Sequence, residues 1–297
     1  MTHSFSPLLR GQLLPKEPLA KYTSWRVGGP ADHVYIPADL ADLTLFLQEL
    51  PPDMPLMWLG LGSNTLIRDS GLDGVVIVTQ GALHELSLVG ERAIRAEAGV
   101  SCGQVARYTA RHELTGLEFM AGIPGTVGGA LAMNAGCNGG ETWQYVSRVE
   151  TIDRNGQHNI RPVSDFTIAY RDVQRPVGEW FVAGWFQLQQ GNKEHSLAMI
   201  RTLLEKRNAS QPTGTANCGS VFRNPPNHFA ARLIEQCGLK GKRLGGASVS
   251  EKHANFILNE GGALASQIEE LIAEVAAIVK EKTGVSLIRE VCIIGKS

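Results

Sequence analysis

The chain of 297 residues lacks a long apolar run, a marked net charge and a leader-like start. No stretch approaches the roughly 20 apolar residues that a membrane-spanning helix needs. Its 28 basic and 29 acidic residues give a formal net charge of -1, which favours neither nucleic acid nor an anionic membrane as a partner. The N-terminal letters MTHSFSPLLRGQLLPKEP do not join a basic start to an apolar segment. We therefore expect no secretory signal, no membrane insertion and a cytoplasmic protein.

Cysteine is also scarce, and no two cysteines form a C-x-x-C pair. An odd number of scattered cysteines is typical of reduced thiols in a cytoplasmic protein, and their spacing predicts no zinc or other metal site. Hydrophobic residues make up 43% of the chain and charged residues 19%, which is ordinary globular composition. The length indicates two domains or three small ones. The five cysteines are Cys102, Cys137, Cys218, Cys237 and Cys292.

Hydrophobic periodicity predicts an α+β fold, with a strand-rich first two-thirds followed by a smaller domain of helices and strands. A polar segment with Gly and Pro, residues 208–219, is the expected boundary between them. The expected strands cover 32–37, 55–64, 74–80, 84–90, 93–100, 146–153, 166–172, 180–189 and 285–295. The expected helices follow Asp39, cover 103–113, start at 191–194, cover 228–238 and run over 263–284.

Several common nucleotide and catalytic motifs are missing. Gly60-Leu61-Gly62 follows a predicted strand, but Thr65 stands where a Rossmann fingerprint needs its third glycine. Gly241-Lys242 has Gln236 where a phosphate-binding loop needs a glycine. The chain also has neither H-E-x-x-H nor G-x-S-x-G.

Glycine is abundant, with 33 residues, and it clusters in LGLGSNTLIRD (59–69) and AGIPGTVGGALAMNAG (121–136). Glycines allow close approach, so that backbone N–H groups can converge on a pyrophosphate. Two neutral tracts of this kind favour a cofactor that carries phosphate over two packing loops, which are the alternative. The residues predicted to contact the cofactor are Gly60, Gly62, Ser63, Asn64, Thr65, Leu66, Ile123, Pro124, Gly125, Thr126, Gly128, Gly129, Asn134 and Gly136.

Seven motifs in order carry a resemblance to a known family. They are TSWRVGGPAD, LGLGSNTLIRD, GLEFMAGIPGTVGGALAMNAG, AYRD, GSVFRNP, AARLIEQCGLKGKRLGGASVSEKHANFILN and IREV. Over about residues 19–295 the chain resembles the UDP-N-acetylenolpyruvoylglucosamine reductases, also called UDP-N-acetylmuramate dehydrogenases, which act in peptidoglycan precursor synthesis and so in cell-wall biogenesis, cell shape and division. The short 137–190 region resembles the compact subclass that lacks an inserted tyrosine loop.

This resemblance implies a vanillyl-alcohol-oxidase-like (PCMH-type) FAD-binding fold in two subdomains, with a C-terminal α+β substrate domain. The expected divisions are 1–85, 86–207 and 208–297, and the C-terminal strand is expected to return to the first. In the implied reaction NADPH reduces FAD, and flavin N5 then delivers hydride to C3 of the enolpyruvyl ether of UDP-N-acetylglucosamine. The substrate carboxylate then takes up negative charge, and C2 needs a proton.

The resemblance assigns these tasks to three residues. Arg171, in AYRD, would bind the substrate carboxylate through its planar guanidinium. Glu290, in IREV, would act on the same group as a protonated acid or through a water, since two facing carboxylates repel each other. Ser220, in GSVFRNP, would protonate C2, with Lys242 or Lys252 as possible relays. The alternatives are an exposed Arg171–Asp172 ion pair, a solvated strand face for Glu290 and an ordinary turn for Ser220.

Further basic and polar residues are expected near the nucleotide sugar or the flavin. The predicted substrate contacts are Arg223, Asn224, Lys252, His253 and Asn255. Arg26 would contact the flavin region or anchor the N-terminal strand. The family commonly has a serine two residues after the motif arginine, where this chain has Val173.

Two rival functions stay open at this point. A flavin oxidase or dehydrogenase of the same fold would not need GSVFRNP and KHANF, and a non-catalytic nucleotide-binding protein would use the glycine tracts for packing alone. The sequence leaves the oligomeric state open, and nothing in it requires more than a monomer.

Overall fold

The computed structural model describes residues 6–296, which divide into two compact units. Within that range the first unit combines residues 6–14, 33–60 and 74–205, and the second combines residues 15–32, 61–73 and 206–296. The break at 205/206 lies close to the expected linker. Residues 15–32 and 61–73 cluster with the C-terminal residues, and not with the rest of the expected segment 1–85. None of the helices described is both long and apolar enough to cross a membrane.

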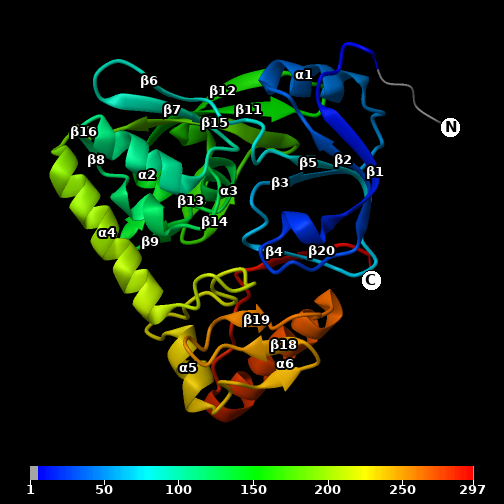
Figure 1. Ribbon diagram of the computed structural model, residues 1–297, viewed down its shortest axis with the longest axis vertical. Helices are drawn as coiled ribbons and strands as arrows, with labels where there is room; N and C mark the ends of the chain where they lie inside the picture. The colour runs from blue at the N-terminus through cyan, green and yellow to red at the C-terminus, as the bar shows by residue number, and fades with distance from the viewer. Residues whose placement is uncertain (1–5, 297) are drawn as a thin grey trace. The chain divides into compact units, whose positions relative to one another are not determined.

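A five-stranded antiparallel sheet lies at the centre of the first unit. Its strands are β6 (Leu86–Leu88), β7 (Ala93–Glu97), β11 (Val146–Asp153), β12 (His158–Pro162) and β15 (Glu179–Gln187). Their order in space is β12-β11-β15-β7-β6, and they lie side by side in Figure 1. Sequence periodicity predicts four of these strands; β12 is the one it misses, because its HNIRP sequence is polar and half-exposed.

This sheet is buried on both faces. Neighbouring strand residues point to opposite faces, and Phe181 and Val182 of β15 belong to different apolar cores. The Phe181 core includes residues of α2 (Cys102–Arg111) and α3 (Val127–Ala132), and α3 packs on β15. Ser101 begins α2 with a capping box, because its hydroxyl accepts from Gln104 N and the Gln104 side chain accepts from Ser101 N.

The Val182 core lies against a second sheet. Its strands, in spatial order, are β1 (Gln12–Pro18), β2 (Pro30–Ile36), β5 (Leu72–Val78) and β3 (Leu56–Leu59). Helix α1 (Leu40–Glu49) starts as predicted at Asp39, whose carboxylate accepts from Asp42 N at 2.9 Å. Asp42 is buried and accepts from the Tyr35 hydroxyl at 2.6 Å, and the Tyr35 ring stacks on Phe46.

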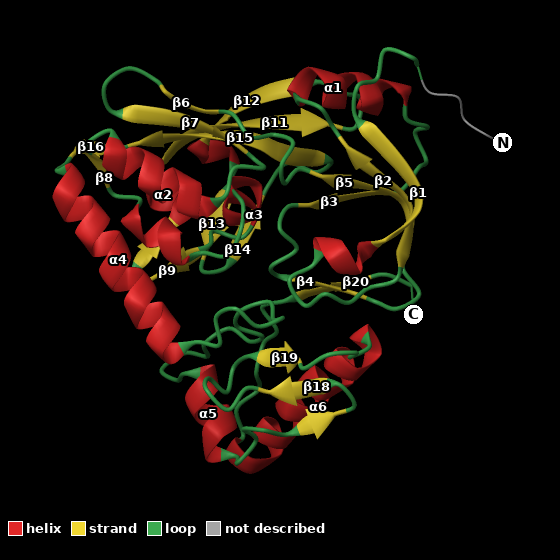
Figure 2. Ribbon diagram, in the orientation of Figure 1, coloured by secondary structure: helices red, strands yellow, loops and turns green. Residues whose placement is uncertain are grey.

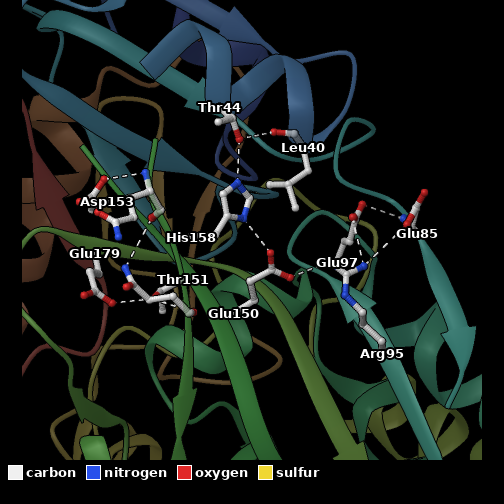
Figure 3. A network of polar contacts seen from close by, with 12 residues as sticks. Leu40, Thr44, Glu85, Arg95, Glu97, Glu150, Thr151, Asp153, His158 and Glu179 are labelled. Carbon is white, nitrogen blue, oxygen red and sulfur yellow. Dashed lines mark hydrogen bonds and ion pairs between the residues drawn. The ribbon is translucent and has the colours of Figure 1, made fainter. Parts of the chain in front are cut away.

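A chain of polar contacts ties α1 to the five-stranded sheet (Figure 3). His158 Nε2 lies 2.7 Å from Thr44 Oγ1, and His158 Nδ1 lies 2.7 Å from Glu150 Oε1. Arg95 donates from Nη2 to Glu150 at 2.9 Å and from Nη1 to Glu97 at 3.3 Å. The figure shows these side chains pointing toward one another from α1, β11, β12 and β7. The network therefore helps to hold the two layers of the first unit together.

The second unit has its own core. Its elements are η1 (Leu19–Tyr22), β4 (Thr65–Ile67), α5 (Ala230–Gln236), β17 (Arg243–Leu244), β18 (Ala247–Val249), β19 (Ile257–Asn259), α6 (Ala265–Thr283) and β20 (Cys292–Ile294). Strand β20 pairs in parallel with β4, so the end of the chain joins residues 65–67. Trp25 and Leu66 are fully buried in this core, and Trp25 Nε1 donates to the Ile257 carbonyl at 2.7 Å.

The remaining elements of the described chain are short except for the long helix α4, which Figure 2 shows. They are β8 (Leu114–Thr115), η2 (Glu118–Gly122), β9 (Gly136–Cys137), β10 (Gly140–Glu141), η3 (Thr142–Gln144), η4 (Val163–Asp165), β13 (Thr167–Ala169), β14 (Asp172–Gln174), β16 (Gln189–Gln190) and α4 (Lys193–Ser210).

The predicted C-terminal elements are partly right. Helix α6 ends at Gly284 with a left-handed φ of 74°, as the pattern over 263–284 predicts. The predicted strand over 285–295 is wrong except for Cys292–Ile294, because residues 285–288 form no ladder and Arg289 makes only an isolated bridge with Phe222. The predicted strand over 166–172 is instead a hairpin, β13–β14.

Candidate cofactor and substrate site

The two glycine tracts meet inside the first unit at Gly60 and Thr126. A Cβ atom built on Gly60 would lie 2.3 Å from Thr126 Oγ1, so a larger residue at position 60 would have to displace the Thr126 side chain. Thr126 is buried, and its hydroxyl has no hydrogen-bond partner among residues 6–296. An orphaned buried hydroxyl costs free energy unless a further group satisfies it. The contact point of the tracts therefore holds a buried polar group without a partner among the described residues.

A cavity of about 180 Å³ opens beside this contact point. Gly60, Gly128 and Gly129 line it together with Trp58 and Trp180. The two indole rings are stacked, with centroids 5.3 Å apart, and Trp58 Nε1 is buried without a partner in the part of the chain that is described. The cavity is smaller than a typical whole-ligand pocket. It fits one flat, polar-edged part of a dinucleotide, such as its base.

The second tract uses more of its own backbone than the sequence predicts. Gly125 N donates to the Ile123 carbonyl, Val127 N to the Val100 carbonyl and Gly128 N to the Ala98 carbonyl, each at 2.8–2.9 Å. These three N–H groups are therefore taken, because α3 begins here and packs on the end of β7. The row of free backbone N–H groups expected over this tract is therefore shorter. Pro124 and Gly129 are exposed, although proline has no N–H group to offer.

The later part of the first tract belongs to the second unit. Gly62 has φ of 59°, and a Cβ there would lie 2.1 Å from the Tyr22 carbonyl. Ser63 and Thr65 are half-buried, and Thr65 pairs with Cys292. The side chain of Leu66 is fully buried in the core, so any contact of this residue with a cofactor would come from its backbone. Asn64 Nδ2 donates to the Glu290 carbonyl at 3.1 Å.

Arg171 lies at the tip of the β13–β14 hairpin, in the first unit. Its backbone is left-handed, with φ of 56°, which is uncommon for a residue with a long side chain. The guanidinium donates to the Asn134 carbonyl at 3.3 Å and to the Gly136 carbonyl at 2.5 Å, and it lies 5.0 Å from the Tyr170 ring centre. The side chain is anchored on the end of the second glycine tract.

Ser220 and Glu290 lie on adjacent segments of the second unit. Glu290 N donates to the carbonyl of Val221, the residue after Ser220, at 2.8 Å. Phe222 and Arg289 form a β-bridge, and Arg223 N donates to the Ile288 carbonyl at 2.9 Å. Both residues are half-buried. Two residues 70 positions apart in the sequence are thus held next to each other by backbone hydrogen bonds.

Two of the predicted substrate contacts keep unused polar atoms. Arg223 Nε and His253 Nδ1 are buried, and neither has a hydrogen-bond partner within the described chain. Burial, helped by the charge of Lys240, lowers the pKa of His253 below its ordinary value. His253 is therefore neutral at pH 7. Both side chains retain hydrogen-bonding capacity for a ligand.

The other predicted substrate contacts are engaged by the protein itself. Asn255 is buried, and its amide binds both backbone groups of Phe222, with Nδ2–O at 2.8 Å and N–Oδ1 at 3.0 Å. These bonds hold the segment that follows Ser220, and contact of Asn255 with the nucleotide sugar stays a prediction. Asn224 Oδ1 accepts from Ala230 N at the start of α5. Lys252 Nζ donates to the Asn208 carbonyl, and Lys242 pairs with Glu274 at 2.7 Å.

Two remaining positions have simple structural settings. Val173 is buried in the first unit's core, so an apolar residue is well suited to the position where the family commonly has serine. Arg26 is exposed and has a left-handed φ of 59°.

Sequence reasoning missed Trp58 and Trp180 as cavity residues. The indole of Trp58 immediately before the first glycine tract was the only local signal, because the pairing of Trp58 with Trp180 is purely tertiary.

Comparisons with known proteins agree with this arrangement. Residues 31–159 match a family model described as FAD binding domain, and residues 211–294 match one described as UDP-N-acetylenolpyruvoylglucosamine reductase, C-terminal domain. Two proteins named UDP-N-acetylenolpyruvoylglucosamine reductase are similar over nearly the whole chain. The one from Legionella pneumophila is 60% identical, over 96% of this chain and 93% of its own; the one from Alkalilimnicola ehrlichii is 56% identical, over 97% and 96%.

Solved structures show the same fold. The crystal structure of UDP-N-acetylenolpyruvylglucosamine reductase from Thermus caldophilus has a TM-score of 0.82 and 31% identity, and covers 96% of this chain and 98% of its own. 6-Hydroxy-D-nicotine oxidase from Arthrobacter nicotinovorans has a TM-score of 0.56 at 11% identity, with 97% and 90% covered, which concerns the fold alone.

The fold, the paired glycine tracts and the FAD-domain match define an FAD-dependent oxidoreductase of the vanillyl-alcohol-oxidase-like, PCMH-type class. Within this class, the chain belongs to the UDP-N-acetylenolpyruvoylglucosamine reductase family, which acts in peptidoglycan precursor synthesis. The expected α+β fold, the enzyme class and the FAD cofactor are thereby confirmed.

Proposed function

We propose that this enzyme uses NADPH to reduce UDP-N-acetylglucosamine enolpyruvate to UDP-N-acetylmuramate in the cytoplasm. The observation that carries the proposal is the backbone pairing of the Ser220 and Glu290 segments in the second unit. This pairing supports a site in which the Ser220 hydroxyl and the Glu290 carboxyl would act on one substrate, as protonation next to a substrate carboxylate requires. When bound, FAD supplies the hydride chemistry, which takes a hydride from NADPH and delivers it to C3 of the enolpyruvyl group.

The first unit supplies the residues that would hold FAD. The Thr126 hydroxyl and Trp58 Nε1 are buried without a hydrogen-bond partner within the described chain. Gly60 and Gly129 line the neighbouring cavity. We assign the cavity to the adenine end of the cofactor and the exposed parts of the glycine tracts to its phosphates. The stacked pair of Trp58 and Trp180 gives the base an aromatic wall.

Arg171 would bind the substrate carboxylate. Negative charge builds up there after hydride transfer, and a fixed guanidinium stabilises it without reorganisation. Glu290 would hydrogen-bond the same group as a protonated acid or through a water. Arg223 and the neutral His253 would contact the nucleotide diphosphate and its neighbourhood, because each keeps an unused buried nitrogen.

Ser220 would complete the reaction by giving its hydroxyl proton to C2. A new C–H bond forms, the Oγ–H bond breaks, and a proton from solvent restores the hydroxyl. Such a weak acid serves only against a strongly basic carbon. Lys252 is adjacent to His253 in the sequence, but its ammonium donates to the Asn208 carbonyl. The ammonium of Lys242 pairs with Glu274. We therefore assign neither lysine as the relay.

Anaerobic stopped flow tests the proposal one half-reaction at a time. In Ser220→Ala, reduction of bound FAD by NADPH should keep its rate. Reoxidation by the enolpyruvyl substrate should slow by about 10²–10⁴-fold, the usual contribution of a general acid. Ser210→Ala is the control, because that exposed hydroxyl bonds only its own helix. Equal slowing of both halves, or none, would rule out Ser220 as the proton donor.

A further inference from the structure

Asn134 is the buried centre of the contacts around Arg171. Only 2% of its surface is exposed, and its φ of 45° is left-handed. The side-chain amide donates from Nδ2 to Glu141 Oε2 at 2.9 Å and to the Ala169 carbonyl at 3.2 Å, and Oδ1 accepts from Trp143 N at 3.1 Å. An amide used in this way by three neighbours is poorly placed to serve as the neutral cofactor donor that the sequence predicts.

These bonds join the glycine tract to the hairpin that carries Arg171. Ala169 is the last residue of β13 and pairs with Asp172, so its carbonyl lies at the base of the two-residue turn Tyr170-Arg171. The side-chain amide of Asn134 donates to this carbonyl. The backbone carbonyl of Asn134 accepts from the Arg171 guanidinium. Gly136, two residues on, accepts the second guanidinium bond. Asn134 therefore contacts both the base of the turn that carries Arg171 and the Arg171 guanidinium.

We propose that Asn134 is a positioning residue that holds Arg171 ready for the substrate carboxylate. The inference rests on the proposed function, because it acts through the role of Arg171. A guanidinium binds a carboxylate best in one plane, and the Asn134 and Gly136 carbonyls each hold one nitrogen of this guanidinium. The left-handed backbone of Asn134 turns its carbonyl toward the arginine while its amide turns toward the hairpin. Asparagine is among the few non-glycine residues that adopt this conformation readily.

Asn138, two residues beyond the end of the tract, offers a matched control. Its φ of 52° is also left-handed, it lies four residues further on, and it is exposed. Among the described residues, the one acceptor of its amide is Cys137 Sγ, at 3.5 Å. Replacing either asparagine by glycine keeps the backbone conformation accessible, so the two variants differ mainly in the side-chain bonds that they remove.

The test is a double-mutant cycle of Asn134→Gly and Arg171→Ala in the FAD-loaded enzyme. Asn134→Gly should keep the 450 nm flavin band and the NADPH half-reaction, and should lower the rate of the enolpyruvyl half-reaction about 10- to 100-fold. In the Arg171→Ala background it should cause no further loss, because a residue that acts through the arginine has nothing left to position. Asn138→Gly should match the parent enzyme throughout.

The outcomes separate this inference from the proposed function. If Arg171→Ala leaves the second half-reaction unchanged, the role of Arg171 in the proposed function falls, and the inference falls with it. If Arg171→Ala slows that half-reaction but Asn134→Gly does not, or if the two losses multiply, only the inference is overturned. Should Asn134→Gly fail to fold, Asn134→Asp enters the same cycle. The aspartate keeps an oxygen that accepts from Trp143 N, but its second oxygen faces Glu141 and Ala169, to which the amide had donated. We expect the same non-additivity with Arg171→Ala in the enolpyruvyl half-reaction.

Discussion

At the scale of single residues, two adjacent glycines of α3 have different reasons to be glycine. A Cβ atom on Gly128 would lie 2.9 Å from the Ala98 Cβ, so this glycine allows the helix to pack on the end of β7. A Cβ atom on Gly129 would meet only Thr126 Oγ1, at 3.9 Å, and Gly129 lines the cavity. Gly128 therefore allows the close packing of α3, whereas Gly129 leaves space for a ligand.

Gly129→Val should consequently give folded protein that no longer binds FAD. The valine side chain would occupy the cavity without striking the protein, and we expect the dissociation constant for FAD to rise at least about tenfold, the equivalent of 1.4 kcal/mol. Flavin fluorescence quenching on titration of apoprotein measures this change. Gly128→Ala serves as the contrast, with a lower melting temperature. Gly129→Val protein that purifies with a full complement of FAD would contradict our assignment of the cavity.

At the scale of elements, α6 depends on a cap from a distant loop. Its N-cap residue, Leu264, provides no side-chain hydrogen bond. Asp69, which follows β4, accepts from Ala265 N and Ser266 N, both at 2.9 Å. Burial raises the pKa of Asp69, but these two hydrogen bonds outweigh burial and hold the pKa below its ordinary value. The helix begins at residue 265 because tertiary structure completes its first turn.

Asp69→Asn should destabilise the protein by about 1 kcal/mol at pH 7, the usual value of a helix cap. Because the folded-state pKa is lowered, the stabilisation is present above the unfolded value of about 3.9 and is lost as the pH falls through the folded value. Urea unfolding should therefore show a constant difference from pH 7 to 5 that shrinks below about pH 4. Asp73→Asn is the control, since its exposed pair with Lys296 is worth about 0–1 kcal/mol. A difference that persists unchanged at pH 3 would disprove the cap.

At the scale of the whole molecule, the second unit is discontinuous in sequence. Its core joins Trp25, Val27 and Leu66 to residues of α5 and α6. The matched C-terminal family model covers residues 211–294, and sequence patterns place a domain at 208–297. The core of the described unit extends beyond both ranges, because residues 15–32 and 61–73 contribute to it.

A fragment of residues 208–297 should therefore not unfold cooperatively. It lacks Trp25, whose fully buried ring and bond to Ile257 it cannot replace. Circular dichroism during a urea titration measures this, with the full chain as the reference. In the full chain, Trp25→Ala should cost about 3–5 kcal/mol, as large buried aromatic residues do. A sigmoidal transition of the isolated fragment would show that these N-terminal segments are dispensable.

The sequence by itself determined the fold class, most elements and the family. Local patterns such as the Asp39 cap, the α6 periodicity and Gly284 depend on nearest neighbours, and they are visible without a structure. Ordered motifs over nearly the whole chain identified the family and FAD. The strand predicted over residues 285–291 is wrong, because alternating apolar residues look like a strand even where most of them have no partner strand.

Only the tertiary structure decided which polar groups are already used. Asn134 and Asn255 look like ligand donors in sequence, yet each amide is taken by backbone groups or side chains far along the chain. Trp58 and Trp180 look like core residues, yet they line a cavity. The physical reason is that a hydrogen-bonding group has a fixed number of partners, and long-range packing, not local sequence, determines which partners are within reach.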